Sequence, residues 1–462
     1  MTSWRLRVVA MVVASICLLV ATGRWVTARS NGTTMLVSRS SEGVQGNGYS
    51  SFPSISADGR YVVFNSSSTN LVEGDTNFYS DVFVRDRWLG TTERVNINSE
   101  GTQANYESTL QRDAISNDGR YVLFVSWADN LALNDTNTIE DIFVHDRVTR
   151  QTTSVSIAPD GTSAAGELLG ATISGNGRYV AFSSHATNLV ISDTNDVPDV
   201  FVRDLQAGVT TRVSVASDGT QADNFARYPA ISSDGRYITF DSTSANLVSD
   251  DTNGVDDVFL HDRMTGQTTR ISVADAGTQG DSYSGNPNIS GDGRYVAFLT
   301  KATNLVTNDS SNLCQVQDHL KLVLHDRVSG QNTCITSVLS DSQHGGRIGV
   351  PSLSETGRYI TFDRWPASGP VGHRHDLQAW VHDRETGETT LISVADDGTP
   401  ANQGVLTWQA ISADGRYIAF DSLSDNLTDD DTNEASDVFV RDRGLTASHW
   451  LYLPITSHRS PG

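Results

Sequence analysis

Residues 229–279 read PAISSDGRYITFDSTSANLVSDDTNGVDDVFLHDRMTGQTTRISVADAGTQ, and most of the chain repeats this stretch with small changes. A Gly-Arg-Tyr signature marks each of seven copies, and the gaps between successive signature arginines are 60, 58, 58, 58, 64 and 58 residues. A nearly constant period indicates a repeat architecture in which each copy forms one structural unit. The signature arginines are Arg60, Arg120, Arg178, Arg236, Arg294, Arg358 and Arg416.

Each copy contains four short apolar runs, which we call A, B, C and D, separated by turn residues. In the fourth copy they span residues 229–232, 236–241, 257–261 and 268–273. β-Branched and aromatic residues bounded by Gly, Asp, Asn and Ser are typical of strands, and Asp234-Gly235 suits a hairpin turn. Runs B and C are apolar at successive positions, so both faces of the sheet need cover. The sequence predicts an all-β fold, a seven-bladed β-propeller of four-stranded antiparallel blades.

The run S-x-D-G-R-Y-[VI]-x-F, followed by [DN]-[VI]-F-V-x-D-R, resembles the WD40-like repeat of TolB-type bacterial β-propellers. The resemblance covers residues 33–443 and implies blades that start near residues 53, 113, 171, 229, 287, 351 and 409, followed by a tail, 444–462. For function it implies little, because such propellers serve as partner platforms, transport components and occasional enzymes.

Closure of the ring requires a fourth strand for the seventh blade. Residues Thr33–Ser38 resemble run D of the other copies, but residues 449–455, HWLYLPI, also fall where the seventh run D belongs. Because Pro454 suits a hydrogen-bonded ladder poorly, we favour closure by Thr33–Ser38, paired with Asp437–Arg441.

The N-terminus has the composition of a signal peptide. Arg5 and Arg7 precede the apolar run VVAMVVASICLLVA, and Val26-Thr27-Ala28 resembles a cleavage site. Residues 1–28 therefore predict export to the periplasm, the cell surface or the medium, with an uncleaved anchor as the alternative. No other segment could span a membrane, so we expect no stable membrane insertion.

The net charge and the cysteine content indicate that nucleic acid is not a partner and that one disulfide forms. The formal net charge of −22 repels phosphate backbones, so nucleic acid is not expected to bind. In an oxidising compartment Cys314 and Cys334 of the fifth copy are expected to form a disulfide; two free buried thiols are the alternative.

Every signature arginine has an aspartate at the end of run C. Antiparallel pairing of B with C places the two side by side, which predicts a repeated structural ion pair rather than a ring of arginines that binds an anion. The aspartates are Asp86, Asp146, Asp204, Asp262, Asp326, Asp383 and Asp442.

The B-to-C connections of five copies contain the spacing D-x-N-x-x-x-D, which fits three ligand positions of an Asp-rich calcium loop. The first ligand position is filled only by Glu73 and Asp429, and only Gly254 supplies the turning glycine. The alternative is that Asp and Asn fold back on their own backbone as Asx-turns. The candidate ligands are Asp75, Asn77 and Asp81; Asp135, Asn137 and Asp141; Asp193, Asn195 and Asp199; Asp251, Asn253 and Asp257; and Asp431, Asn433 and Asp437.

Copies five and six break this pattern at the same end of the ring. His344, Trp365, His373 and His375 fall in their loops, where the histidines could bind a transition metal or act on a substrate; the alternative is that they are ordinary loop residues.

No nucleophile elbow, phosphate-binding loop, H-E-x-x-H or dinucleotide fingerprint is present. The sequence favours an exported, non-enzymatic binding platform for a protein or glycan, with an acidic loop face that calcium could order. The alternative is a polysaccharide lyase or hydrolase with a metal-assisted site in the loops of copies five and six.

Overall fold

The computed structural model describes residues 32–445, except 133, 134, 136, 138, 308–312, 318, 338–347 and 365–376. The chain divides into two units, Met1–Asn31 and Gly32–Gly462. The predicted signal peptide and residues 449–455 of the tail lie outside the described residues. Within the described residues, no helix is both long enough and apolar enough to cross a membrane.

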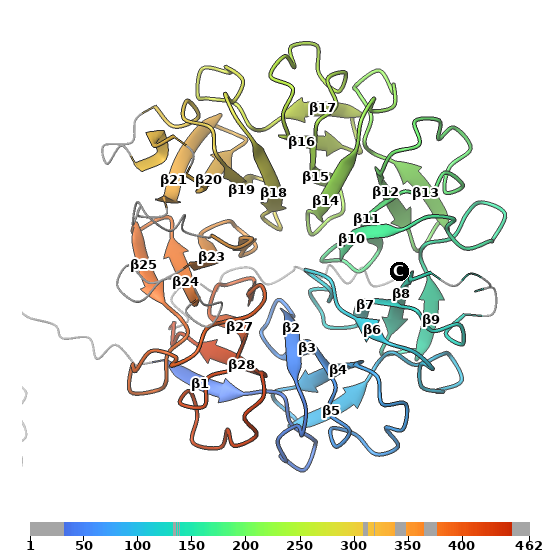
Figure 1. Cartoon of the computed structure of the whole chain (residues 1–462), viewed down its shortest axis with the longest axis vertical. Helices are drawn as coiled ribbons and strands as arrows, with labels where there is room; N and C mark the ends of the chain where they lie inside the picture. Colours follow the sequence, from blue (N-terminus) through green and yellow to red (C-terminus); the bar gives the residue numbers. More distant parts are fainter. Residues whose placement is uncertain are drawn as a thin grey trace, which may run out of the picture. The chain divides into compact units, whose positions relative to one another are not determined.

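The second unit is built from seven four-stranded antiparallel sheets (Figure 1). Blade one contains β2 (Ser50–Ile55), β3 (Tyr61–Ser66), β4 (Asp81–Asp86) and β5 (Thr91–Arg94). Blade two contains β6 (Ser108–Thr109), β7 (Tyr121–Ser126), β8 (Asp141–Asp146) and β9 (Gln151–Ser154). Blade three contains β10 (Leu168–Ile173), β11 (Tyr179–Ser184), β12 (Asp199–Asp204) and β13 (Val209–Arg212). Blade four contains β14 (Ala226–Ile231), β15 (Tyr237–Ser242), β16 (Asp257–Asp262) and β17 (Gln267–Arg270).

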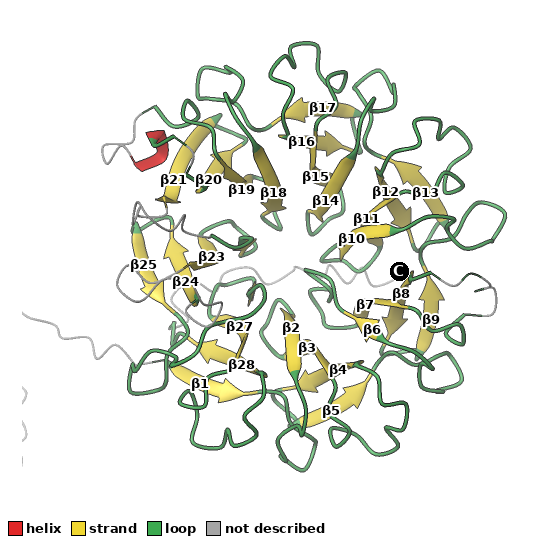
Figure 2. Cartoon of the chain, viewed as in Figure 1, coloured by secondary structure: helices red, strands yellow, loops and turns green. Residues whose placement is uncertain are grey.

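Blade five contains β18 (Ser284–Ile289), β19 (Tyr295–Thr300), β20 (Lys321–Asp326) and β21 (Gln331–Ser337), with the short 3₁₀ helix η1 (Leu313–Gln315) (Figure 2). Blade six contains β22 (Ser352–Leu353), β23 (Tyr359–Arg364), β24 (Gln378–Asp383) and β25 (Glu388–Leu391). Blade seven contains β26 (Ala410–Ile411), β27 (Tyr417–Ser422), β28 (Asp437–Asp442) and, from the N-terminus, β1 (Thr33–Leu36). The seven-bladed propeller predicted from the repeat is confirmed.

Ring closure uses the N-terminal strand. β1 pairs antiparallel with β28, from Thr33 opposite Asp442 to Leu36 opposite Phe439. The favoured pairing of Thr33–Ser38 with the last strand is therefore confirmed. One blade made from both ends of the chain joins the two ends of the ring through its own sheet.

The inner strand differs from its sequence prediction. In blade four, A begins at Ala226 rather than at Pro229, because the register shifts between Arg227 and Ala230 and the strand continues across this bulge. The predicted start at the proline missed the residues that lie before the bulge.

The core lies between the blades. In five blades strands B and C carry a phenylalanine pair that is directly opposite in register, such as Phe240 and Phe259, and both of these side chains are fully buried. Their ring centroids lie 6.0 Å apart. Burial on both faces of B and C is the arrangement that their successive apolar residues predict.

The Gly-Arg-Tyr signature makes the joint between neighbouring blades. A Cβ atom on Gly119, at φ +73°, would lie 2.1 Å from Cδ2 of Tyr61 in the preceding blade, and Arg147 covers the same ring with its guanidinium carbon 4.2 Å from the centroid. Only glycine therefore fits the turn. The equivalent pairs are Tyr121–Gly177, Tyr179–Gly235, Tyr237–Gly293, Tyr295–Gly357, Tyr359–Gly415 and Tyr417–Gly59.

The seven predicted ion pairs are present. In blade four Nε and Nη2 of Arg236 donate to the two carboxylate oxygens of Asp262 at 2.8 and 2.7 Å, and these bonds hold the pKa of Asp262 well below its ordinary value. The other six pairs have the same partners as predicted. The predicted disulfide is also present, with Cα atoms of Cys314 and Cys334 6.0 Å apart.

Candidate functional site

The inner strands of all seven blades surround a central channel that has two different ends. We call the side with the A–B and C–D turns the turn face and the side with the B–C and D–A connections the loop face. At the turn face, backbone hydrogen bonds link the A–B turns of neighbouring blades into a closed ring. The donors and acceptors are Ala57 N to Asn117 O, Asn117 N to Gly175 O, Asn176 N to Ser233 O, Ser233 N to Gly291 O, Asp292 N to Glu355 O, Glu355 N to Ala413 O and Ala413 N to Ala57 O.

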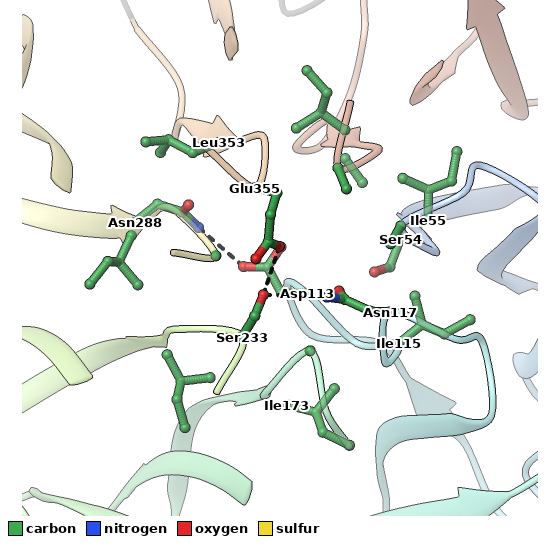
Figure 3. Close-up of a pocket in the computed structure, with 18 residues that line it drawn as sticks. Ser54, Ile55, Asp113, Ile115, Asn117, Ile173, Ser233, Asn288, Leu353 and Glu355 are labelled. Atoms are coloured by element: carbon green, nitrogen blue, oxygen red, sulfur yellow. Dashed lines mark hydrogen bonds between the residues drawn. The ribbon is translucent and has the colours of Figure 1, made fainter. Parts of the chain in front are cut away.

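Side chains narrow the channel further near this ring (Figure 3). The Ser233 hydroxyl donates to Glu355 at 2.8 Å, and the amide of Asn288 donates to Asp113 at 3.1 Å across the channel. Burial raises the pKa of Glu355 and of Asp113. The remaining cavity has a volume of about 90 Å³, which holds a few water molecules but is far below the roughly 300 Å³ of a typical small-molecule site.

The loop-face end is wider. A cavity of about 550 Å³ extends between blades six, seven and one, beside Phe52, Val350 and Trp408. A second cavity, of about 190 Å³, lies in the channel mouth and shares Val350 and Trp408 with the first; Arg112 and Tyr228 line its other side. The mouth of the channel at the loop face is therefore the place where a small ligand could enter.

Several residues at the rim of this mouth have positive φ, and buried aspartates of the preceding blade accept hydrogen bonds from their main chain. Phe52, Tyr228 and Asn286 occupy the bulges of their inner strands with φ of 55°, 51° and 53°, values that bulky residues rarely adopt. The main-chain N–H of Asn286 donates to Asp241 of the preceding blade at 2.9 Å, and that of Phe52 is bonded to Asp421 in the same way. Burial raises the pKa of Asp241 to about 7.

The five D-T-N loops of the loop face form Asx-turns. In each loop the asparagine side-chain oxygen accepts a hydrogen bond from the main-chain N–H two residues later, as between Asn77 and Tyr79 at 3.0 Å. The equivalent asparagines are Asn137, Asn195, Asn253 and Asn433. Backbone shaping by Asx-turns is therefore observed in every candidate calcium loop.

A glutamine bridges the two aspartates in four of these loops. Nε2 of Gln221 donates to Asp193 and to Asp199, both at 2.8 Å, while its Oε1 accepts from Thr194. The other bridges are Gln103 between Asp75 and Asp81, Gln279 between Asp251 and Asp257, and Gln45 between Asp431 and Asp437. The amide thus draws together the carboxylates that a cation would otherwise hold.

An arginine adds charge compensation in blades one, three and four but not in blades two and seven. Arg94 lies 3.5 Å from Asp75 and 3.2 Å from Asp81, and Arg212 lies 3.5 Å from both aspartates of its loop. In blade four Arg270 lies 3.7 Å from Asp251. Burial raises the pKa of Asp141 and of Asp437, in the two blades without this arginine, to about 6.

Blade two has neither compensating group. Ser163 stands where the other loops have glutamine, and one carboxylate oxygen of Asp135 is buried without a hydrogen-bond partner in the part of the chain that the structure describes. Glu73 and Asp429, the residues predicted for the first ligand position, are exposed. Among the described residues, no group of three or more His, Cys, Asp or Glu side chains is placed to hold a metal. Calcium binding stays a prediction.

The second predicted site, in the loops of blades five and six, lies outside the described residues. His344, Trp365, His373 and His375 all lie outside the described residues. The prediction that they converge on a metal or a substrate is therefore untested.

An exposed aromatic patch on the loop face was missed by the sequence reasoning. Phe78 is 90% exposed and has φ of 61°, at the position that Gly254 fills in blade four. Its neighbour Tyr79 packs against Tyr106 of the next connection, with ring centroids 4.5 Å apart. The main-chain N–H of the exposed Trp127 donates to Glu107, next to Tyr106, at 3.2 Å. We call these four exposed aromatic residues of neighbouring connections, of which Tyr79 and Tyr106 are in ring contact, the aromatic patch. The bulky residue after D-T-N was the one feature of the sequence that indicated it.

The comparisons with known proteins agree on the fold. No protein-family model matches the sequence, and no curated protein sequence does. Among solved structures, an oligogalacturonate lyase in complex with manganese is similar, with a TM-score of 0.50 and 11% identity over 89% of this chain and 91% of that one.

Two TolB structures are also similar. A putative TolB from Agrobacterium tumefaciens has a TM-score of 0.41 and 16% identity over 76% of this chain and 94% of its own. TolB from Acinetobacter baumannii has a TM-score of 0.40 and 13% identity over 84% and 81%. The chain is a seven-bladed propeller, as the resemblance to TolB-type repeats implies, and identities at this level speak for the fold alone.

Proposed function

We propose that the protein is an exported, non-enzymatic binding platform that recognises a protein or glycan partner through its loop face. The observation that carries this proposal is the aromatic patch. Tyrosine and tryptophan rings expose an apolar face beside a polar group, and large exposed apolar clusters mark interaction sites. The apolar faces of sugar rings stack on such side chains, so the patch favours a glycan.

The scaffold behind the patch supports the same function. The loops of this face are fixed by Asx-turns and by glutamine bridges between consecutive connections, and binding residues are commonly carried on loops that a rigid framework positions. Ordering these loops before the partner arrives reduces the entropy lost on binding. Export is proposed from residues 1–28 of the sequence.

Calcium remains part of the proposal for the loops that lack an arginine. In blade seven a cation at Asp431 and Asp437 would replace the amide of Gln45. In blade two the partnerless oxygen of Asp135 leaves an acceptor for a hard cation.

The proposal is tested by affinity electrophoresis in gels that contain a neutral or an acidic polysaccharide, such as β-glucan, xylan or polygalacturonate. We expect one of these to retard the wild-type protein and Tyr106→Ala or Tyr79→Ala to restore mobility. Met264→Ala is the matched control, because it removes a 75% exposed apolar side chain from the turn face. Equal retardation of all variants, or no retardation of the wild type, would overturn the glycan form of the proposal.

The alternative function is a polysaccharide lyase or hydrolase that uses the loops of blades five and six. The cavity of about 550 Å³ beside Asp363 of blade six is the observation in its favour. The same polysaccharides, incubated with the protein and assayed for new reducing ends, separate the two functions: a steady increase with time favours the enzyme.

A further inference from the structure

One position of the inner strand differs in every blade. The third residue before the inner-strand isoleucine or leucine is Phe52, Arg112, Gly170, Tyr228, Asn286, Val350 or Trp408, seven different residue types. The isoleucine that serves as the reference is replaced by leucine only in blade six, where it is Leu353. All seven variable positions line the two cavities of the channel mouth. Diversity at one position of an otherwise regular repeat marks a surface shaped for a purpose other than folding.

Arg112 stands in an insertion that brings a cation into the mouth. Blade two has eight residues from Ser108 to Ile115 where blade four has six from Ala226 to Ile231, which explains the first gap of 60 residues between signature arginines. The guanidinium makes no hydrogen bond with any described residue, and its Nη1 is buried. Every signature arginine, by contrast, has its aspartate.

A second donor lines the same cavity. Nε1 of Trp408 is buried and has no hydrogen-bond partner among the described residues, and its ring packs against Phe52 with centroids 4.9 Å apart. Buried donors without acceptors are costly, so two in one cavity indicate an acceptor beyond the described residues.

The nearby acids are already engaged. Asp241 accepts from Arg227 at 3.2 Å and from Asn286, and Asp113 accepts from Asn288. Arg112 is thus the cation of the mouth whose buried Nη1 has no hydrogen-bond partner among the described residues. The other lining residues are mostly apolar, with Leu169, Pro229 and Val350 among them, beside the polar Gln111 and Asn286.

We propose that the channel mouth binds a small carboxylate that carries a ring, with the carboxylate on Arg112 and Nε1 of Trp408 and the ring against Trp408 and Tyr228. Arginine binds carboxylates through paired N–H groups, and aromatic walls suit a flat or ring-shaped apolar face. The size fits, because a cavity of roughly 150 Å³ accommodates benzene and this one has about 190 Å³. The site shares no residue with the aromatic patch, so this proposal goes beyond the proposed platform function and does not depend on it.

The test is isothermal titration calorimetry of the full protein with phenylacetate, D-glucuronate and benzyl alcohol. We expect one or both acids to bind and benzyl alcohol, which lacks the carboxylate, not to bind measurably. Arg112→Gln should weaken binding on the order of tenfold to a hundredfold, the range of one charged hydrogen-bonding group. Trp408→Phe, which keeps an aromatic ring but removes the donor, should weaken it less.

Two controls separate binding from folding. Arg150→Gln removes a positive charge from a turn of the same blade on the opposite face and should leave affinity unchanged. The melting temperature of Arg112→Gln should stay close to that of the wild type, because the guanidinium has no hydrogen bond to a described residue to lose and its loss ends only the attraction to Asp113 and Asp241. Tighter binding of phenylacetate identifies an aromatic acid and tighter binding of glucuronate a sugar acid. Binding of neither acid at millimolar concentration, equal binding of benzyl alcohol, or full affinity in Arg112→Gln would overturn the proposal.

Discussion

Substitution of Gly119 by alanine tests the joint between blades one and two. An alanine at φ +73° costs about 1–2 kcal/mol through its backbone alone. The new Cβ would also lie 2.1 Å from Cδ2 of Tyr61, so the ring must move away from Arg147, and such overpacking costs about 1–3 kcal/mol more. We expect Gly119→Ala to lower the free energy of unfolding by about 2–5 kcal/mol, measured by equilibrium urea denaturation.

Gly101 provides the matched control. Its φ is +85°, and a Cβ built there meets nothing within 4 Å, so Gly101→Ala should show only the backbone cost of about 1–2 kcal/mol. In a Tyr61→Ala background the packing part of the Gly119→Ala effect should disappear, which a double-mutant cycle measures directly. If Gly119→Ala costs no more than Gly101→Ala, or if the cycle gives no coupling with Tyr61, the account of the signature as an interblade joint is wrong.

Burial raises the pKa of Asp421 to about 6, and a raised carboxyl pKa means that its stabilising contribution is present at low pH and is lost as pH rises from about 4 through 6. Asp421→Asn should therefore remove part of this decline, by up to about 3 kcal/mol, in urea titrations at pH 4 and pH 7. Phe240→Ala should cost about 3–5 kcal/mol by the same assay, because its side chain is fully buried; a loss well below 1 kcal/mol would contradict the core described above. Millimolar calcium should raise the melting temperature, since one site at ten times its dissociation constant adds about 1.4 kcal/mol. Asp437→Ala should reduce this shift more than Asp199→Ala, whose loop holds Arg212; a wild-type protein with no shift after metal removal would end the calcium prediction.

The fold could be predicted from the sequence because every copy repeats the same four apolar runs and the same Gly-Arg-Tyr signature. Strand order, the ion pair of Arg236 with Asp262 and closure by Thr33–Ser38 all follow from period and spacing. What it could not show is which side chains of different copies meet. The contact of Tyr61 with Gly119 joins two signatures in neighbouring blades, and only the twist and stacking of the sheets bring them together.

The same limit applies to the candidate site. The G-T-Q sequences were visible beside the D-T-N loops, but the bridge of Gln221 to Asp193 joins two connections that are separated in the chain by strands C and D. A spacing argument could recognise acidic residues suited to calcium and could not see that an amide already pairs them. The position of Arg112 could not be predicted for a different reason. The only sign of it in the sequence was two extra residues between the first two signature arginines.

The two ends of the channel show how a repeat protein separates folding from function. At the turn face the glycine and tyrosine of the signature have the same role in every blade, and a ring of backbone hydrogen bonds from Ala57 round to Ala413 joins the A–B turns. At the loop face the rim residue changes from blade to blade and has positive φ at Phe52, Tyr228 and Asn286. Two rim side chains have buried donors without an acceptor among the described residues. Strain and unpaired donors lower stability and are retained where binding compensates for them. Because the variable rim residues of the loop face line the two cavities of the channel mouth, this end is where the protein's ligands should be sought.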